Sequence, residues 1–118
     1  MARYIMTVRS NPVAGREDEY NEWYDRYQLP QLVETPTFVA GQRYKLAPIE
    51  MPDYPGYEKP KHRYMVVYEI ETESLERTKQ ILWGPDNVSR IRQSTAFDSS
   101  NVACQIYMPI GLRVSKDA

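Results

Sequence analysis

The sequence is poor in several residue types and patterns, and each shortage narrows what the protein can be. Its 118 residues include a single cysteine, Cys104, so no disulfide can form within the chain. A lone cysteine suits a reducing compartment, and the first residues lack the apolar core of a signal peptide. No apolar run approaches the ~20 residues of a membrane-spanning helix. We therefore expect a cytoplasmic protein with no membrane partner.

Neither sign of charge dominates the chain. The 15 Lys and Arg residues nearly balance the 16 Asp and Glu residues, which leaves a net charge of -1. The most basic stretch, Lys59 to Arg63, is short and contains a proline. Because nucleic-acid-binding proteins carry basic patches that neutralise phosphates, we expect no nucleic-acid partner.

Histidine is as scarce as cysteine, since His62 is the only one. One His and one Cys cannot supply the three or four protein ligands of an ordinary zinc site. The sequence also contains no glycine-rich phosphate loop and no nucleophile elbow. We therefore expect no metal and no cofactor.

Tyrosine, in contrast, is abundant: the chain has ten tyrosines and two phenylalanines. A tyrosine combines a large apolar ring with a polar hydroxyl, so it suits core edges, interfaces and pockets for flat organic ligands. For any single tyrosine, the structural and the functional interpretations remain open.

Alternating apolar residues predict four strands. Their expected ranges are Arg3–Arg9, Thr37–Leu46, His62–Glu71 and Val102–Val114. Between the second and third strands lies a long segment with four prolines, Ala47 to Lys61. A loop of this length in a small domain is either functional or mobile. Its Tyr54 and Tyr57 are candidates to cover a pocket.

Two helical regions separate the strands. The first begins near Arg16, and helical spacing gives it one aromatic stripe, made of Tyr20, Trp23, Tyr24 and Tyr27. Pro30 disfavours helical geometry at Leu29, so we expect the helix to kink or end there, with a short turn through residues 31–33. The second region begins near Ser74, with Thr72 or Glu73 as caps, and ends at Trp83. A shorter helical piece is expected from Asp86 to about Ser94.

The element order βαββαβ predicts one α+β domain, residues 1–118, with a ferredoxin-like four-stranded antiparallel sheet. Right-handed crossovers place both helices on one face of that sheet. The alternation assigns a bulky apolar set to this face: Tyr4, Met6, Val8, Phe38, Ala40, Tyr44, Tyr64, Val66, Tyr68, Ile70, Cys104, Ile106 and Met108. The opposite face, which includes Arg43, Glu69 and Tyr107, is half apolar. We therefore expect a second sheet to pack against it, with a cavity between the two.

Several segments together resemble the dimeric α/β-barrel superfamily and, within it, the EthD-like proteins. They are residues 15–24, Leu29-Pro30, residues 38–44, residues 62–64 and residues 68–71. The resemblance covers nearly the whole chain and implies a homodimer whose two sheets face each other as a barrel. Relatives in this superfamily include cofactor-free monooxygenases, polyketide cyclases, muconolactone isomerases and haem-degrading enzymes.

One position departs from that pattern. Relatives with the Trp-Tyr and Leu-Pro motif commonly place a histidine immediately before Leu-Pro, and this chain has Gln28 there. An imidazole can carry a proton near neutral pH, whereas a carboxamide can only donate and accept hydrogen bonds. Gln28 therefore either orients a substrate oxygen or has a structural role.

The candidate catalytic residues lie on the sheet. Glu69 is a candidate general base, and Arg43 and Tyr107 are candidates to polarise a substrate oxygen. An ion pair between Glu69 and Arg43 is the structural alternative, because buried charges are usually paired. The candidate substrate-binding residues are Trp23, Tyr24, Gln28 and His62, although an aromatic stripe is more often core and a lone histidine more often structural.

These observations predict a small cofactor-independent enzyme that acts on a hydrophobic aromatic or cyclic oxygenated metabolite. The expected reaction is proton-transfer chemistry: isomerisation, cyclisation, dehydration or cofactor-free oxidation. The alternative is a non-catalytic small-molecule-binding or accessory protein on the same homodimeric scaffold, and the absence of the motif histidine brings it to nearly equal weight with the enzyme.

Overall fold

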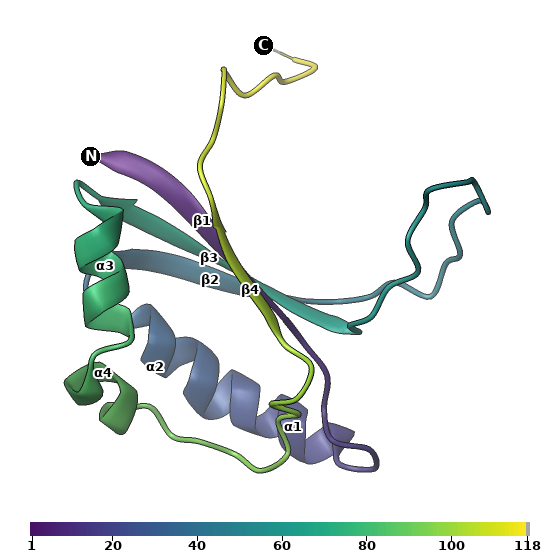
Figure 1. Cartoon of the computed structure of the whole chain (residues 1–118), viewed down its shortest axis with the longest axis horizontal. Helices are drawn as coiled ribbons and strands as arrows, with labels where there is room; N and C mark the ends of the chain where they lie inside the picture. The colour runs from purple at the N-terminus through teal and green to yellow at the C-terminus, as the bar shows by residue number, and fades with distance from the viewer. Residues whose placement is uncertain (118) are drawn as a thin grey trace.

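The computed structural model describes residues 1–117 and contains one antiparallel sheet with helices along one face (Figure 1). The strands are β1 (Ala2–Ser10), β2 (Phe38–Lys45), β3 (Tyr64–Thr72) and β4 (Ala103–Tyr107). They are ordered β2-β3-β1-β4, and every neighbouring pair is antiparallel. The α+β ferredoxin-like fold predicted from the sequence is therefore confirmed.

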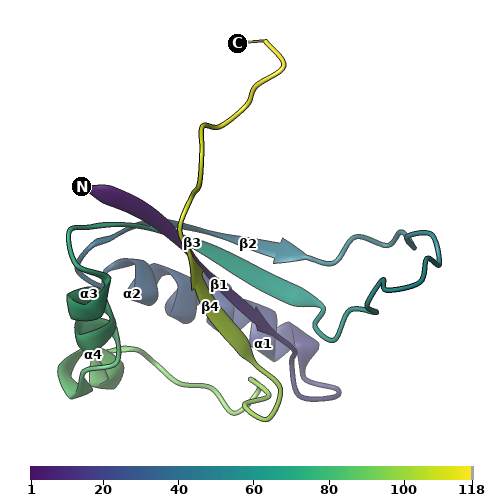
Figure 2. The same ribbon diagram turned by 45° about the horizontal axis from the view of Figure 1, so that its top comes forward.

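The helices lie beneath the sheet, and its other face is left open (Figure 2). They are α1 (Glu17–Trp23), the π-helical turn η1 (Tyr24–Gln28), α2 (Leu29–Val33), α3 (Leu75–Leu82) and α4 (Pro85–Arg90). The Ser74 side chain caps α3 by accepting a hydrogen bond from the Arg77 amide, so the prediction of Thr72 or Glu73 as the cap was wrong. No helix among residues 1–117 is long and apolar enough to cross a membrane.

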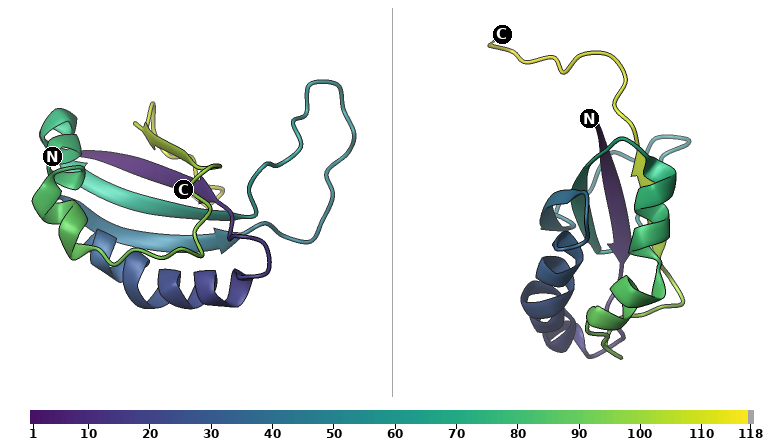
Figure 3. Two further views of the ribbon diagram at one scale, coloured as in Figure 1. Left: turned by 60° about the horizontal axis from the view of Figure 1, so that its bottom comes forward. Right: turned by 90° about the vertical axis from the view of Figure 1, so that its left-hand side faces the viewer.

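The first helix neither ends nor breaks at Pro30. It continues from α1 through η1 into α2 as one rod along the sheet (Figure 3, left). Pro30 has no amide hydrogen, and its ring would clash with the carbonyl one turn earlier in an α-helix. The chain widens into a π turn instead, in which the Leu29 amide donates to the Tyr24 carbonyl, five residues back. The expected kink is thus replaced by a local widening.

A β-bulge interrupts β2 near its start. Phe38 lies opposite Ile70 and Ala40 lies opposite the adjacent Glu69, so the intervening Val39 is an extra residue. Because side chains alternate between the two faces of a strand, one extra residue moves every later side chain to the opposite face.

Arg43 is the residue most affected by this bulge. It lies opposite Val66, and both side chains face the helices. Ala40, Gln42 and Tyr44 face the open side. The predicted faces were correct for β1, β3 and β4, but for β2 they were wrong beyond Val39, because alternation alone does not register an inserted residue.

The core lies between the sheet and the helices. Tyr20, Tyr24 and Tyr68 are at most 1% exposed and pack with aliphatic residues of β1 and β3. The hydroxyl groups of Tyr20 and Ser10 are 2.6 Å apart and share a hydrogen bond. Several of the tyrosines therefore belong to the hydrophobic core.

Three predicted boundaries were too generous by two residues or more. The third strand begins at Tyr64 rather than His62, α4 ends at Arg90 rather than near Ser94, and the last strand ends at Tyr107 rather than Val114. Residues 46–63 form a long loop that projects beyond the sheet (Figure 1). Tyr54 and Tyr57 are both exposed and stack edge to face on each other at 5.3 Å, so they do not cover a pocket.

Gly41 allows the helix to approach β2 closely. A Cβ atom at this position would lie 2.8 Å from Leu29 Cδ1, 3.0 Å from Tyr68 Cδ1 and 3.1 Å from Val33 Cγ2.

We expect Gly41→Ala to lower the free energy of unfolding by roughly 1–3 kcal/mol, because these side chains must move apart. Chemical denaturation measures the change. The exposed neighbour Gln42→Ala is the control and should be close to neutral; equal effects in the two variants would contradict the close approach.

Candidate functional site

A pocket lies inside the protomer, between the helix-covered face of the sheet and the helices. Its volume is about 230 Å³. The lining is predominantly apolar and consists of Met6, Val8, Tyr24, Gln28, Leu32, Tyr68, Leu82, Trp83, Val88, Ile91, Gln93, Phe97, Val102 and Cys104. We call this cavity the inner pocket. A concave apolar site with a few polar groups is the usual form of a small-molecule site.

The π turn brings Tyr24 and Gln28 to the inner pocket together. Both residues belong to η1 and line the cavity. Gln28 Oε1 is buried and has no hydrogen-bond partner. A buried carboxamide oxygen without a partner is costly, so a group supplied by a ligand would stabilise it. π turns of this kind are frequent at functional sites.

Tyr68 adds a second unpartnered group, from the centre of β3. The residue is 0% exposed, and its hydroxyl has no hydrogen-bond partner. Burial raises the pKa of Tyr68, and burial likewise raises the pKa of Tyr24. Both phenols therefore keep their protons at neutral pH and are available as hydrogen-bond donors.

The inner pocket is uncharged. Its lining includes no Asp, Glu, His, Lys or Arg among the residues that the structure describes. Its one other ionisable group is the Cys104 thiol, whose pKa is raised by burial. The site therefore matches a neutral ligand, and none of its side chains is a general base at neutral pH.

Arg43 lies beside this pocket rather than in the open face. Its side chain is 13% exposed and donates to Asn21 Oδ1 at 2.7 Å and to Asp25 Oδ1 at 2.7 Å. The guanidinium carbon lies 4.7 Å from the centre of the Tyr24 ring. The predicted ion pair of Arg43 with Glu69 is wrong, because the bulge places the two side chains on opposite faces of the sheet.

Glu69 and Tyr107 share a groove on the open face. Ile5 of β1 pairs with Glu69 of β3 on one side and with Tyr107 of β4 on the other. The groove has a volume of about 370 Å³ and is also lined by Val39 and by the Arg3–Glu71 ion pair at 2.9 Å. Glu69 is exposed at its edge. The structure thus brings these two candidates together but separates them from the inner pocket.

The other two candidates lie elsewhere. The Trp23 indole N–H donates to the Arg92 carbonyl at 2.9 Å, and Trp23 is not part of the inner-pocket lining. His62 lies at the base of the long loop, in a separate concavity lined by Lys45, Lys61 and Arg63 among others. Its Nε2 atom is buried without a hydrogen-bond partner.

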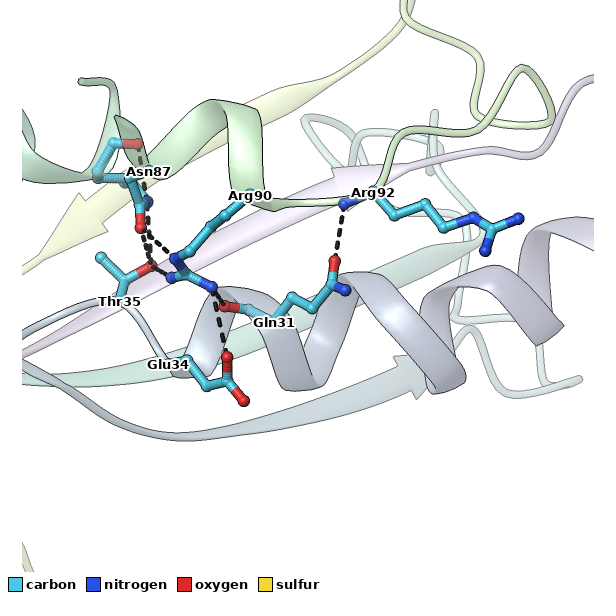
Figure 4. Close-up of polar contacts among 7 residues, drawn as sticks. Gln31, Glu34, Thr35, Asn87, Arg90 and Arg92 are labelled. Carbon is cyan, nitrogen blue, oxygen red and sulfur yellow. Dashed lines mark hydrogen bonds and ion pairs between the residues drawn. The ribbon is translucent and has the colours of Figure 1, made fainter. Parts of the chain in front are cut away.

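A polar cluster fixes one wall of the inner pocket by joining α4 to α2 (Figure 4). Arg90 donates to Asn87 Oδ1 at 3.0 Å, to Thr35 Oγ1 at 3.1 Å and to the Gln31 carbonyl at 2.7 Å. The Arg92 amide donates to Gln31 Oε1 at 2.7 Å. Leu32 and Ile91 line the pocket on either side of this contact, so the cluster holds the two helices at a fixed separation.

Sequence reasoning missed Tyr68 as a site residue and assigned it, with Cys104, to the helix-facing core. The available signal was its hydroxyl, because a tyrosine in the middle of an aliphatic strand face needs a hydrogen-bond partner. Among residues 1–117, no three His, Cys, Asp or Glu side chains gather closely enough to hold a metal ion.

This arrangement of sheet and helices is the ferredoxin-like fold. Similar solved structures include a dabb family protein from Mesorhizobium loti (12% identity, TM-score 0.62, 94% of this chain and 100% of that chain). An ethyl tert-butyl ether d (EthD) family protein from Bacillus halodurans is also similar (11% identity, TM-score 0.61, 93% and 100%). So is the haem-degrader MhuD from Mycobacterium tuberculosis (18% identity, TM-score 0.59, 95% and 99%), solved with two haems in its active site.

These comparisons support the resemblance to EthD-like proteins at the level of fold. No family model matches the sequence. No curated protein matches it either.

Cys104 is a chemical reporter for the inner pocket. Because burial raises its pKa, little of the thiol is ionised at neutral pH, and the thiolate is the reactive form. We expect slow labelling by a small maleimide at neutral pH, with a rate that keeps rising above pH 9, measured by mass spectrometry. The urea-unfolded chain is the control and should label with an ordinary thiol pH profile. Identical profiles for the folded and unfolded chains would contradict the raised pKa of the Cys104 thiol.

Proposed function

We propose that the protein binds a small, neutral aromatic or cyclic oxygenated molecule in the inner pocket. The observation that carries this proposal is the pair of unpartnered buried atoms, the Tyr68 hydroxyl and Gln28 Oε1, in a mostly apolar cavity. A carbonyl oxygen of the ligand accepts from the Tyr68 hydroxyl, and a hydroxyl or N–H of a ligand that has one donates to Gln28 Oε1. Each bond relieves a desolvation penalty that the empty pocket carries.

The uncharged lining favours some ligands over others. A haem carries two propionates, and the lining provides no cation to pair with them. The haem chemistry of MhuD is therefore not carried over to this chain. A neutral ring with one or two oxygens fits both the polarity and the size of the cavity.

Binding is better supported than proton-transfer catalysis in this pocket. Tyr68 is a suitable donor to an oxygen on which negative charge develops. A proton-transfer enzyme also needs a base, however, and the lining offers no carboxylate or imidazole. The non-catalytic or accessory alternative raised from the sequence is thus the favoured function for the inner pocket.

An enzymatic function on the open face is the second candidate. Glu69 and Tyr107 line one groove there and combine a carboxylate base with a phenolic donor. The same face exposes Ile5, Val39 and Tyr44. Large exposed apolar side chains favour burial against a partner, so we propose that two copies pack these faces together as a homodimer and close the groove.

A comparison of two tyrosines tests the binding function. We expect Tyr68→Phe to raise the free energy of unfolding by about 1 kcal/mol, because it removes an unsatisfied buried hydroxyl. The same change should weaken binding of the neutral fluorescent ketone prodan about fivefold, since one net hydrogen bond is worth ~1 kcal/mol. Denaturation and fluorescence titration measure the two effects.

Tyr64→Phe is the matched control, on the same strand and the same face. The Tyr64 hydroxyl donates to Glu17 Oε2 at 2.7 Å, and Tyr64 is not part of the inner-pocket lining. This variant should lose stability and keep its affinity for prodan. The binding proposal fails if Tyr68→Phe and Tyr64→Phe have the same effect on prodan affinity.

Glu69→Gln separates the two candidate functions. It removes a carboxylate from the open face and leaves the inner pocket unchanged, so prodan affinity should stay at the wild-type value. If the open face is catalytic, turnover in a screen of cyclic ketones and lactones should be lost in this variant, while the exposed Glu73→Gln control keeps it. Wild-type turnover in Glu69→Gln would reject Glu69 as the base.

A further inference from the structure

The concavity that holds His62 lies where the long loop joins the sheet (Figure 1). Its volume is about 820 Å³, within the roughly 300–1,000 Å³ range of small-molecule pockets. Arg9 of β1 and Met65 of β3, which pair in the ladder, form part of its wall. It shares no lining residue with the inner pocket or with the open-face groove. We call it the loop-end pocket.

Positive charge dominates the lining of the loop-end pocket. Among the residues that the structure describes, its only carboxylate is that of Glu58, against five cationic side chains. The cations are Arg9, Lys45, Lys59, Lys61 and Arg63. Glu17 lies behind the lining and pairs with Lys45 at 3.5 Å and with Arg63 at 2.6 Å, so the cations outnumber these two carboxylates by three. A concavity lined by one sign of charge concentrates ions of the opposite sign.

Arg9 is the cation that most needs a counter-charge. Its side chain is partly buried, and within residues 1–117 no carboxylate lies at ion-pairing distance from it. The guanidinium makes one long hydrogen bond, from Nη1 to Thr7 Oγ1 at 3.4 Å. A partly desolvated guanidinium without a counter-ion is costly, and a carboxylate or phosphate offsets that cost with two parallel hydrogen bonds.

His62 adds a second unsatisfied group to the same pocket. Its Nε2 atom is buried without a hydrogen-bond partner. The backbone on either side of it is fixed by Asn11, which accepts from the Arg63 amide at 2.7 Å and donates to the Lys61 carbonyl at 2.9 Å. The imidazole is thus held in place, where its Nε2 can donate an N–H to an oxyanion.

We propose that the loop-end pocket binds a small polyanion, a molecule with two or more carboxylate or phosphate groups. The Arg9 guanidinium binds one of these groups, with His62 Nε2 as a further donor to it. Lys59 and Lys61 of the loop bind the other. A single anionic group would leave most of the excess positive charge unpaired, so the lining favours a ligand with more than one.

This site goes beyond the binding function proposed for the inner pocket. The inner pocket is uncharged and takes a neutral ring, whereas the loop-end pocket takes an anion, and the two share no residue. Either proposal can therefore fail without the other.

Titration calorimetry on the full-length chain tests the proposal with two probes, citrate and inorganic pyrophosphate, at one fixed salt concentration. The variants are Arg9→Gln, Lys61→Gln and His62→Phe, the last of which keeps a ring and removes both nitrogens. Arg77→Gln is the matched control, because it removes the same charge from an exposed position of α3 outside the pocket. Near-ultraviolet circular dichroism verifies that each chain is folded.

We expect Arg9→Gln to weaken binding of the preferred probe about tenfold, because a charge-assisted hydrogen-bonded pair is lost. Lys61→Gln and His62→Phe should each weaken it about threefold, and Arg77→Gln should match the unaltered chain. All four variants should keep their affinity for prodan. Tighter binding of citrate identifies a polycarboxylate ligand, and tighter binding of pyrophosphate identifies a phosphorylated one.

Three results would overturn the proposal. One is no binding of either probe at millimolar concentration. Another is equal weakening by Arg9→Gln and Arg77→Gln, because the probes would then respond to surface charge in general. The third is an Arg9→Gln chain that binds both probes normally but dimerises more weakly in sedimentation equilibrium, because the counter-charge of Arg9 would then come from a second copy.

Discussion

The partly buried guanidinium of Arg43 joins the first helix to the sheet. It bonds to Asn21 and Asp25 on the helix and lies against the ring of Tyr24, with only 13% of its side chain exposed. A cation held this far from solvent needs these partners, so the helix cannot slide or rotate along β2 without breaking them. The position of η1, and with it the shape of the inner pocket, depends on this contact.

Two local irregularities make the contact and the pocket possible. The bulge at Val39 turns Arg43 toward the helix, and the π turn before Pro30 lets the helix continue while Tyr24 and Gln28 both reach the cavity. Each irregularity interrupts the regular pattern of backbone hydrogen bonds. Each also places side chains where a regular strand or α-helix would not. Irregularities of this kind concentrate at functional sites.

The electrostatics of the site follow from this geometry. With Arg43 engaged by Asp25 and Asn21, and Glu69 on the far face, the inner pocket keeps polar groups that are all neutral. We propose that such a cavity selects an uncharged ligand by desolvation and orients it through Tyr68 and Gln28. A carboxamide such as that of Gln28 cannot carry a proton at neutral pH, which fits the proposed binding function rather than proton transfer.

The fold could be predicted from the sequence because three patterns indicate the same architecture. They are the alternation of apolar residues in the strands, the helical spacing of apolar residues in the helices, and the order of these elements along the chain. Faces were predicted correctly wherever the ladder is regular, as for Met6, Val66 and Cys104. The assignment of Arg43 failed because period-two reasoning cannot locate an inserted residue. Gly41, a glycine inside a strand pattern, was the available sign of a bulge or a close backbone approach. The hydroxyl of Tyr68 on an apolar strand face marks the residue in the sequence, but packing decides whether that hydroxyl has a hydrogen-bond partner.

The central claim is that the ligand site lies between the helices and the sheet of one protomer. A crystal structure of the protein soaked with prodan tests this claim most directly. Density for the ketone in the inner pocket, with its oxygen within hydrogen-bond distance of Tyr68 Oη, is the predicted result. Density confined to the open-face groove beside Glu69 and Tyr107, with the inner pocket empty or filled by ordered water on Tyr68, would contradict it.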